Sequence, residues 1–385
     1  MKIAISFGFF LPVPPARGGA TEKIWFALAK RLAARGHDVT VFTRTWPGWA
    51  DQETIEGVRF ERLPGHDHTT KLWLNLLLDF RWSLRVRRKL APHAVVISHN
   101  ISLPWLLTRL PRRHSAPVSV VIGRMPKGQV RTYGKVDRIY ATSEAVAAQA
   151  LRENTAVKAQ LHTLRNSIDW HSLQSKAETK SGGDSDTVRI GYVGRIHPEK
   201  GLDLMIEAGM RLAARPELPR WKISLVGPVK ITDGGGGEPF AASLAEKAKA
   251  VGLADRFEII PPLWSTEALA TFYRSLSIFV YPTRAEQGEG LSVAPIEAMA
   301  AGAVPVLSSL PCYTDLLSPG KDGLLFDHRS PDAGPLLAKA LSELLIDEDR
   351  RTALAEAARA TARRFDYDAV AAELEADLKT LGAAR

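Results

Sequence analysis

Two stretches of this chain place charged side chains beside glycine-containing loops, an arrangement suited to a ligand that carries both phosphates and hydroxyl groups. The later stretch, 284–302, joins a loop with Glu289 to a short helix with Glu297. Pro295 suits an early helical position and Gly302 suits the helix end, so we expect Glu297 in the first turn. Amides at a helix N-terminus donate to phosphate oxygens, whereas carboxylates accept hydrogen bonds from sugar hydroxyls.

The earlier stretch has the pattern of a strand, a loop and a helix. An apolar run, 188–193, ends at Gly194, and Arg195 and Lys200 follow before a helical pattern begins at Leu202. Ligands of open α/β sheets bind at the carboxyl ends of the strands. Because Arg offers a rigid fork and Lys a point charge, we expect Arg195 and Lys200 to contact phosphate groups there.

The two stretches together closely resemble the motifs of the retaining family-4 glycosyltransferases, which have the two-domain GT-B fold. The pieces that carry the resemblance are Gly194-Arg195, Lys200-Gly201, and Glu289 followed by Glu297-Ala-Met. Further matching pieces are Gly18-Gly19-Ala20, Ala141-Thr-Ser-Glu144 and Asn166-Ser-Ile-Asp169, so the resemblance covers nearly the whole chain.

This resemblance implies roles for individual residues. Arg195 and Lys200 would neutralise the diphosphate of a nucleotide sugar and, with Glu289 beside the donor sugar, form the catalytic set. Glu297 would bind both ribose hydroxyls. The full donor-binding set that we expect is Gly18, Gly19, Gly194, Gly290, Leu291, Ser292 and Glu297. The sequence leaves open whether Glu286 or Glu289 faces the sugar.

Three residues of the first half are candidates for the acceptor side. His99 and Asn100 follow an apolar run, where a structural histidine and a functional one are both plausible readings. After the next such run, 118–122, the family often carries a histidine, but this chain has Gly123 and Arg124. That departure predicts that Arg124 meets an anionic group.

Strands that alternate with helices in both halves predict an α/β protein with two Rossmann-like domains and parallel sheets. By resemblance, the sheets face each other across a cleft, and a C-terminal helix crosses back to the first domain. The domains that we expect are an N-terminal acceptor-binding domain, 1–174, a polar linker, 175–187, a nucleotide-sugar-binding domain, 188–365, and the returning helix, 366–385.

Charge is divided unevenly along the 385 residues. The net charge is +9, yet residues 1–180 carry +15 and residues 181–385 carry −6. A helix predicted over 71–90 is rich in Leu and Trp and then in Arg, which fits either a core helix with a basic end or an interfacial helix beside anionic lipid. No run approaches the ~20 apolar residues of a membrane span. We therefore expect a cytoplasmic protein. If the helix over 71–90 is interfacial, we also expect peripheral binding to the inner face of the cell membrane.

Cysteine and histidine give no sign of redox or metal chemistry. The single cysteine, Cys312, reads as a buried apolar side chain, and His66-Asp67-His68 lacks the further ligands that a metal site needs. We expect no metal and no cofactor, with the nucleotide sugar as co-substrate.

By resemblance, the chain transfers a hexosyl group from a UDP-hexose or GDP-mannose type of donor, with retention. The acceptor would be a hydroxyl group of a saccharide or lipid-linked saccharide in bacterial cell-surface glycan synthesis, such as that of lipopolysaccharide. The leaving phosphate would take the acceptor proton, so no covalent nucleophile is required. A GT-B sugar phosphorylase or nucleotide-sugar epimerase is the main alternative. A dinucleotide-binding fingerprint and a nucleic-acid-binding motif are both absent, so neither a dinucleotide-dependent oxidoreductase nor a nucleic-acid partner is expected.

Overall fold

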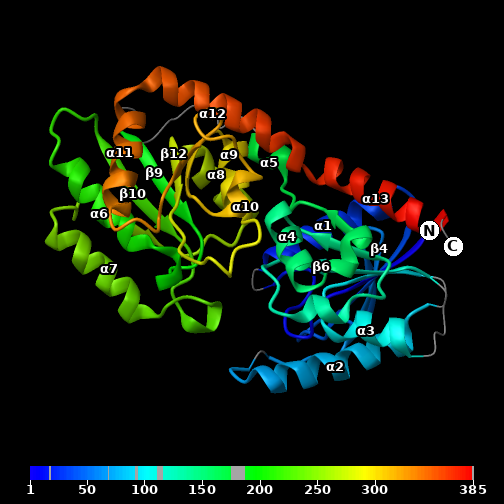
Figure 1. Cartoon of the computed structure of the whole chain (residues 1–385). Helices are drawn as coiled ribbons and strands as arrows, with labels where there is room; N and C mark the ends of the chain where they lie inside the picture. Colours follow the sequence, from blue (N-terminus) through cyan, green and yellow to red (C-terminus); the bar gives the residue numbers. More distant parts are fainter. Residues whose placement is uncertain (17–18, 68, 92–93, 111–115, 175–186, 384–385) are drawn as a thin grey trace. The chain divides into compact units, whose positions relative to one another are not determined.

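The structure is a computed structural model that describes residues 1–385 apart from 17–18, 68, 92–93, 111–115, 175–186 and 384–385. The chain forms two compact units (Figure 1). Unit 1 contains residues 1–167 and 367–385, and unit 2 contains residues 168–366. The predicted linker, 175–187, lies outside the described residues except for Thr187, and the division into an acceptor domain and a donor domain stays a prediction.

The sheet of unit 1 has the order β3-β4-β2-β1-β5-β6-β7-β8. Its strands are β1 (Lys2–Ser6), β2 (Asp38–Arg44), β3 (Gln52–Ile55), β4 (Val58–Leu63), β5 (Val95–Ser98), β6 (Val118–Ile122), β7 (Arg138–Ala141) and β8 (Leu161–Thr163). All neighbouring strands are parallel except β3 and β4, which form an antiparallel hairpin at the edge. Strand order reverses between β1 and β5.

The helices of unit 1 include one from the end of the chain. They are α1 (Ala20–Ala34), α2 (Leu72–Lys89), α3 (Ser102–Arg109), α4 (Glu144–Glu153) and α13 (Tyr367–Ala383), with 3₁₀ turns η1 (Gln129–Thr132) and η2 (Thr155–Gln160). Helix α13 packs against α1. Its Asp377 accepts hydrogen bonds from Arg138 Nε and Nη2, at 2.9 and 2.7 Å, and from the Tyr140 hydroxyl at 2.7 Å. The C-terminal helix therefore belongs to unit 1, as predicted.

The sheet of unit 2 is parallel throughout and has the order β11-β10-β9-β12-β13-β14. Its strands are β9 (Val188–Val193), β10 (Trp221–Val226), β11 (Phe257–Ile260), β12 (Ile278–Tyr281), β13 (Val304–Ser308) and β14 (Leu324–Phe326). This is the order 3-2-1-4-5-6 of a Rossmann fold, which reverses between β9 and β12. Ligands of such sheets bind outside the carboxyl ends of the strands at that reversal.

Unit 2 surrounds its sheet with helices. They are α5 (Trp170–Gln174), α6 (Leu202–Ala213), α7 (Glu238–Ala250), α8 (Thr266–Ser275), α9 (Val293–Ala301), α10 (Pro311–Thr314), α11 (Ala333–Ile346) and α12 (Glu348–Ala362), with 3₁₀ turns η3 (Pro198–Lys200), η4 (Ile231–Asp233) and η5 (Arg363–Phe365). Within the described ranges of both units, no helix is long and apolar enough to cross a membrane.

Candidate functional site

The loops after β9 and β12 meet at the point where the strand order of unit 2 reverses. The backbone N–H of Arg284, three residues after β12, donates to the carbonyl oxygen of Glu199 at 2.8 Å. Gly201 allows this approach, because a Cβ at this position would lie 2.2 Å from the carbonyl oxygen of Pro282. The backbone of Gly201 is also left-handed, with φ of 62°. The two motifs found in the sequence are thus held together by their backbones.

Lys200 and Glu289, one from each loop, form a buried ion pair through Nζ and Oε1. Thr283 Oγ1 donates to the same carboxylate oxygen at 3.2 Å, and Ser292 Oγ donates to the other oxygen at 2.5 Å. Burial by itself would lower the pKa of Lys200, but the neighbouring Tyr281 and Glu289 raise it above its usual value. Lys200 therefore remains charged at neutral pH.

Arg195 lies at the more open side of the same loop. Its Nη1 donates to the carbonyl oxygen of Gly234 at 3.0 Å, and its Nη2 pairs with Glu199. Burial favours a higher pKa for Glu199, but the cations Arg195 and Lys200 outweigh it, so the Glu199 pKa is lowered. The structure thus places the two predicted cations on one loop, each with a carboxylate partner.

Glu297 lies on α9, but not where the sequence led us to expect it. The helix begins at Val293, so Glu297 is in the second turn rather than the first, and that prediction was wrong. The helix end is as predicted, since Gly302 adopts a left-handed φ of 92°. The Glu297 side chain is buried, and its Oε2 accepts a hydrogen bond from the Tyr273 hydroxyl at 3.0 Å.

The structure distinguishes Glu286 from Glu289 by their partners. Glu286 is half-exposed and bonds to His328 Nε2 at 2.8 Å and to Arg329 Nε at 2.7 Å. Burial pushes its pKa upward, but Arg329 and His328 lower it overall. Of these two carboxylates, Glu289 is the one that pairs with Lys200.

A group of buried tyrosines supports these side chains, and sequence reasoning missed them. They are Tyr192, Tyr273, Tyr281 and Tyr313. The ring of Tyr281 stacks on that of Tyr192 at 5.4 Å and lies 5.4 Å from Lys200 Nζ, while the Tyr313 hydroxyl lies 3.0 Å from Ser292 Oγ. Burial raises the pKa of each tyrosine, so they act as neutral hydrogen-bonding groups. For two of them the sequence signal was position along a strand, because Tyr281 ends β12 and Tyr192 is the residue before the last of β9.

In unit 1, the loop before α1 contains one predicted residue that is described, Gly19; Gly18 lies outside the described residues. Gly19 has a left-handed φ of 103°, and a Cβ there would lie 2.2 Å from a carboxylate oxygen of Glu22. Burial raises the pKa of Glu22, and the charge of Arg124 opposes this rise. Arg124 itself is exposed, and its positive charge acts on the carboxylate of Glu22.

His99 and Asn100 lie at the strand-order reversal of unit 1, after β5. The His99 ring packs against Phe7 and Trp25, with ring centroids 5.2 and 4.8 Å away, and burial lowers its pKa to about 3. His99 is therefore neutral. The Asn100 side chain is buried, accepts from Ser6 Oγ at 2.6 Å and donates to the carbonyl oxygen of Phe7 at 3.1 Å. These contacts explain both residues structurally, and an acceptor role for them stays a prediction.

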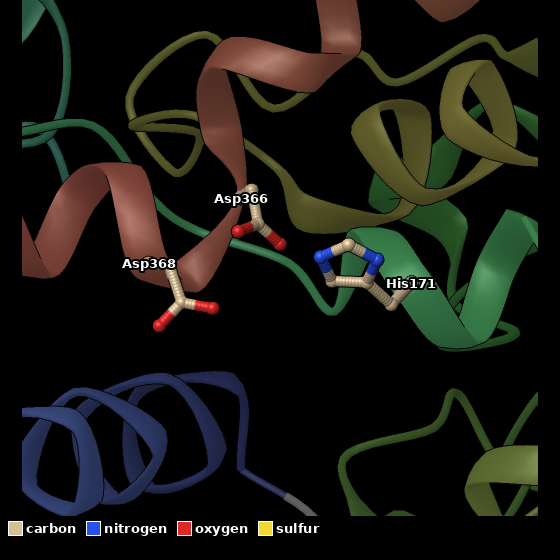
Figure 2. Close-up of side chains that lie close together, drawn as sticks. All are labelled: His171, Asp366 and Asp368. Atoms are coloured by element: carbon tan, nitrogen blue, oxygen red, sulfur yellow. The ribbon is translucent and has the colours of Figure 1, made fainter. Parts of the chain in front are cut away.

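Among the described residues, one group of three possible metal ligands occurs, His171, Asp366 and Asp368 (Figure 2). Asp366 accepts a hydrogen bond from the backbone N–H of Trp170, and Asp368 pairs with Arg31 at 3.5 Å. Since His171 belongs to unit 2 and Asp368 to unit 1, the group defines no metal site within either unit. His68 lies outside the described residues, so the predicted absence of metal at 66–68 remains a prediction.

Comparison with known proteins gives matches over both halves of the chain. The family model "Glycosyl transferases group 1" matches residues 174–361, and the model "Glycosyl transferase 4-like domain" matches residues 19–167. The chain is 25% identical to a GDP-mannose-dependent alpha-(1-6)-phosphatidylinositol monomannoside mannosyltransferase from Mycobacterium tuberculosis, over 97% of each chain. It is 28% identical to a D-inositol 3-phosphate glycosyltransferase from Thermobispora bispora over 66% of this chain, and it spans 59% of that relative's length.

A solved structure with the same fold is that of Anabaena Alr3699/HepE in complex with UDP. It is 15% identical to this chain and covers 99% of it, and the match spans 100% of the HepE chain with a TM-score of 0.74. At this identity the likeness concerns the fold alone.

Proposed function

The chain belongs to the group 1 glycosyl transferases and has the GT-B fold, and we propose that it transfers a hexosyl group, with retention, from a nucleotide diphosphate sugar to an acceptor hydroxyl. The observation that carries this proposal is the buried pair of Lys200 and Glu289 at the strand-order reversal of unit 2. Removing two charges from water costs free energy that their mutual attraction often does not offset, so a buried ion pair contributes little to the stability of a fold. A role in ligand binding therefore accounts for this pair better.

In the proposed reaction, the donor diphosphate replaces Glu289 as the partner of Lys200. Arg195, on the more open side of the loop, approaches the same phosphates. Both cations stabilise the negative charge that grows on the leaving diphosphate as its bond to the sugar breaks, and this raises the rate. Amides of Gly290, Leu291 and Ser292 contact the β-phosphate or the sugar, and Gly194 leaves room beside them.

Glu289, released from Lys200, accepts hydrogen bonds from sugar hydroxyls. The new bond forms between C1 of the sugar and the acceptor oxygen on the face that the phosphate leaves, and the acceptor proton passes to a phosphate oxygen. Glu297, fixed by Tyr273, accepts hydrogen bonds from both ribose hydroxyls. Glu289 is preferred to Glu286 as the sugar-facing carboxylate because Glu286 is held by His328 and Arg329.

The donor class is proposed as UDP-hexose or GDP-mannose. The UDP complex of HepE and the GDP-mannose dependence named for the mycobacterial mannosyltransferase support these two choices. The acceptor is proposed as a saccharide or lipid-linked saccharide of cell-surface glycan synthesis, and the phosphatidylinositol monomannoside in that relative's name supports the lipid-linked form. The reaction would then take place in the cytoplasm at the inner face of the membrane.

A thermal-shift panel of UDP, GDP, ADP and CMP sugars tests the donor. A ligand at 100 times its Kd stabilises the protein by ~2.7 kcal/mol. Incubation of the stabilising donor with candidate acceptors, followed by NMR of the anomeric proton, tests retention. Failure of every nucleotide sugar to stabilise the protein would overturn the proposal, while a sugar phosphate or an epimerised donor as product would favour the phosphorylase or epimerase alternative.

A further inference from the structure

Helix α2 of unit 1 exposes an uninterrupted apolar stripe. Its members and their exposed fractions are Leu72 (73%), Trp73 (64%), Leu76 (39%), Leu77 (39%) and Phe80 (38%). Their spacing of i, i+1, i+4, i+5 and i+8 puts them on one side of an α-helix. Single exposed apolar residues are common on soluble proteins, but a contiguous stripe marks an interaction surface.

The stripe is held outward by the packing of the helix. Trp82 and Val86, on the opposite side of α2, are buried in the core of unit 1. At the start of the helix, Asn75 Nδ2 donates to the carbonyl oxygen of Thr69 at 2.8 Å, and Asn75 Oδ1 accepts from the Thr69 backbone N–H at 3.0 Å. The apolar side chains are therefore presented to solvent by an anchored helix.

Every exposed charge on α2 is positive. Arg81 and Arg88 are exposed, and together with Leu77 and Leu84 they follow the helical spacing i, i+4, i+7 and i+11, so they share one face. The acidic residue of this helix, Asp79, is buried, and it accepts hydrogen bonds from the Ser102 backbone and the Asn100 side chain. The apolar stripe thus continues into a basic surface towards the C-terminal end of α2.

Helix α3 lies beside α2 (Figure 1). It also exposes apolar and basic side chains. Ile101, just before α3, is 42% exposed and Trp105 is 36% exposed. The Arg109 guanidinium lies 5.8 Å from the Trp105 ring. In unit 2, the most exposed large apolar side chains, Ile231 and Trp264, stand on separate segments.

We propose that α2, with α3, docks unit 1 on an anionic phospholipid membrane. The apolar stripe would enter the boundary between headgroups and acyl chains, and Arg81 and Arg88 would contact anionic headgroups. Charge favours lipid over a second copy of this chain, because two α2 faces brought together would place like charges opposite each other. This inference deepens the proposed function, since it puts the transferase where a lipid-linked acceptor lies.

Co-sedimentation of the full chain with vesicles tests the apolar stripe. The lipids are phosphatidylcholine alone and phosphatidylcholine mixed with phosphatidylglycerol, and binding to the mixed vesicles is expected. Trp73→Ser combined with Leu76→Ser should weaken this binding by about tenfold or more, because two apolar side chains no longer leave water. The matched control is Ile231→Ser combined with Trp264→Ser, which removes two comparably exposed apolar residues from unit 2 and should leave vesicle binding unchanged.

A charge-matched pair tests the basic surface. Arg81→Ala with Arg88→Ala should weaken binding to the mixed vesicles by about fivefold for each residue removed. Lys247→Ala with Lys249→Ala, on exposed positions of α7, changes the net charge equally and should have little effect. Added salt should weaken binding of the unmodified chain in the same direction.

Three results would overturn the docking proposal: no binding to mixed vesicles, equal losses in the variants and their controls, or self-association of the chain that the Trp73 and Leu76 substitutions abolish. The last result would make α2 a protein interface. Stabilisation by the nucleotide sugar is measured on the same variants without vesicles. Retained stabilisation with no vesicle binding rejects only the docking proposal, whereas vesicle binding without nucleotide stabilisation rejects only the proposed reaction.

Discussion

Substitution of either Lys200 or Glu289 is expected to destabilise the fold. Breaking a buried ion pair from one side costs about 3–5 kcal/mol, because the remaining charge is left unpaired. Substitution of Lys200 therefore mixes a loss of stability with a loss of chemistry. Arg195, which is more exposed and bonded to the Gly234 carbonyl, offers a cleaner test of phosphate contact.

Arg195→Ala is expected to lower kcat by about a hundredfold, equivalent to ~2.7 kcal/mol of transition-state stabilisation. The melting temperature should change little. Arg211→Ala is the matched control, because Arg211 also pairs with a glutamate four residues away, Glu207, but lies on α6. Steady-state kinetics compare the two. Near-normal turnover by Arg195→Ala would remove Arg195 from the diphosphate site.

Substitutions of Glu297 and Glu289 should have different effects on nucleotide binding and on sugar transfer. Glu297→Ala is expected to weaken binding of the free nucleoside diphosphate, because ribose contact does not require the sugar. Glu289→Ala should leave that affinity unchanged or tighter, since it releases Lys200, yet it should strongly reduce sugar transfer. Titration calorimetry and turnover assays separate the two effects. The reverse pattern would exchange the two roles.

Tyr273 is expected to act on the ribose contact through Glu297. Tyr273→Phe removes the hydroxyl that bonds to Glu297 Oε2, and loss of a hydrogen bond to a charged group costs about 1.5–3 kcal/mol. The affinity for a ribonucleoside diphosphate should fall, whereas that for its 2′,3′-dideoxy analogue should not. Tyr313→Phe, at an equally buried tyrosine bonded to Ser292, should not show this selectivity. Equal losses for both nucleotides would mean a merely structural role.

At the scale of elements, the site depends on the close approach of the loops after β9 and β12. Gly201→Ala should destabilise unit 2 by about 1–3 kcal/mol more than Gly252→Ala. Both glycines have a left-handed φ, but a Cβ at Gly201 would collide with the Pro282 carbonyl, whereas one at Gly252 meets nothing within 4 Å. Denaturant unfolding measures the difference. Equal destabilisation by the two substitutions would show that the two loops can move apart at little cost in free energy.

At the scale of the whole molecule, each unit has its own sheet and helices, and α13 completes unit 1. Asp377→Asn weakens the contacts of α13 with Arg138 and Tyr140, which are mostly buried. A loss of about 3 kcal/mol from unit 1 is expected.

Scanning calorimetry should show this loss as a lower unfolding temperature for unit 1. Nucleotide sugar should instead raise the unfolding temperature of unit 2. A single transition that both changes shift equally would contradict the assignment of these effects to separate units. Asp347→Asn, at the cap of α12 in unit 2, is the control and should leave the unit 1 transition in place.

The resemblance to the glycosyltransferase family implied that the C-terminal helix returns to the first domain. The sequence by itself determined the alternation of strands and helices, the α/β class and the two motifs with Arg195, Lys200 and Glu289. These depend on local patterns: apolar periodicity, glycine at left-handed positions, and charges placed just after strands. Gly302 ended its helix as expected because only the local backbone was at issue. Glu297 was placed one turn too early, because the expected helix start rested on Pro295, whereas α9 begins at Val293, directly after its N-cap residue Ser292.

Only the tertiary structure decided which of these charges are partners. Lys200 and Glu289 are 89 positions apart, and they meet because β12 lies beside β9 although two strands intervene in the sequence. The same reversal of strand order places Tyr281 against Tyr192. Burial, which depends on the whole fold, makes His99 neutral. The packing of α8 against α9 brings the Tyr273 hydroxyl to Glu297. Local patterns locate groups along the chain, but the order of strands in the sheet determines which groups share a site.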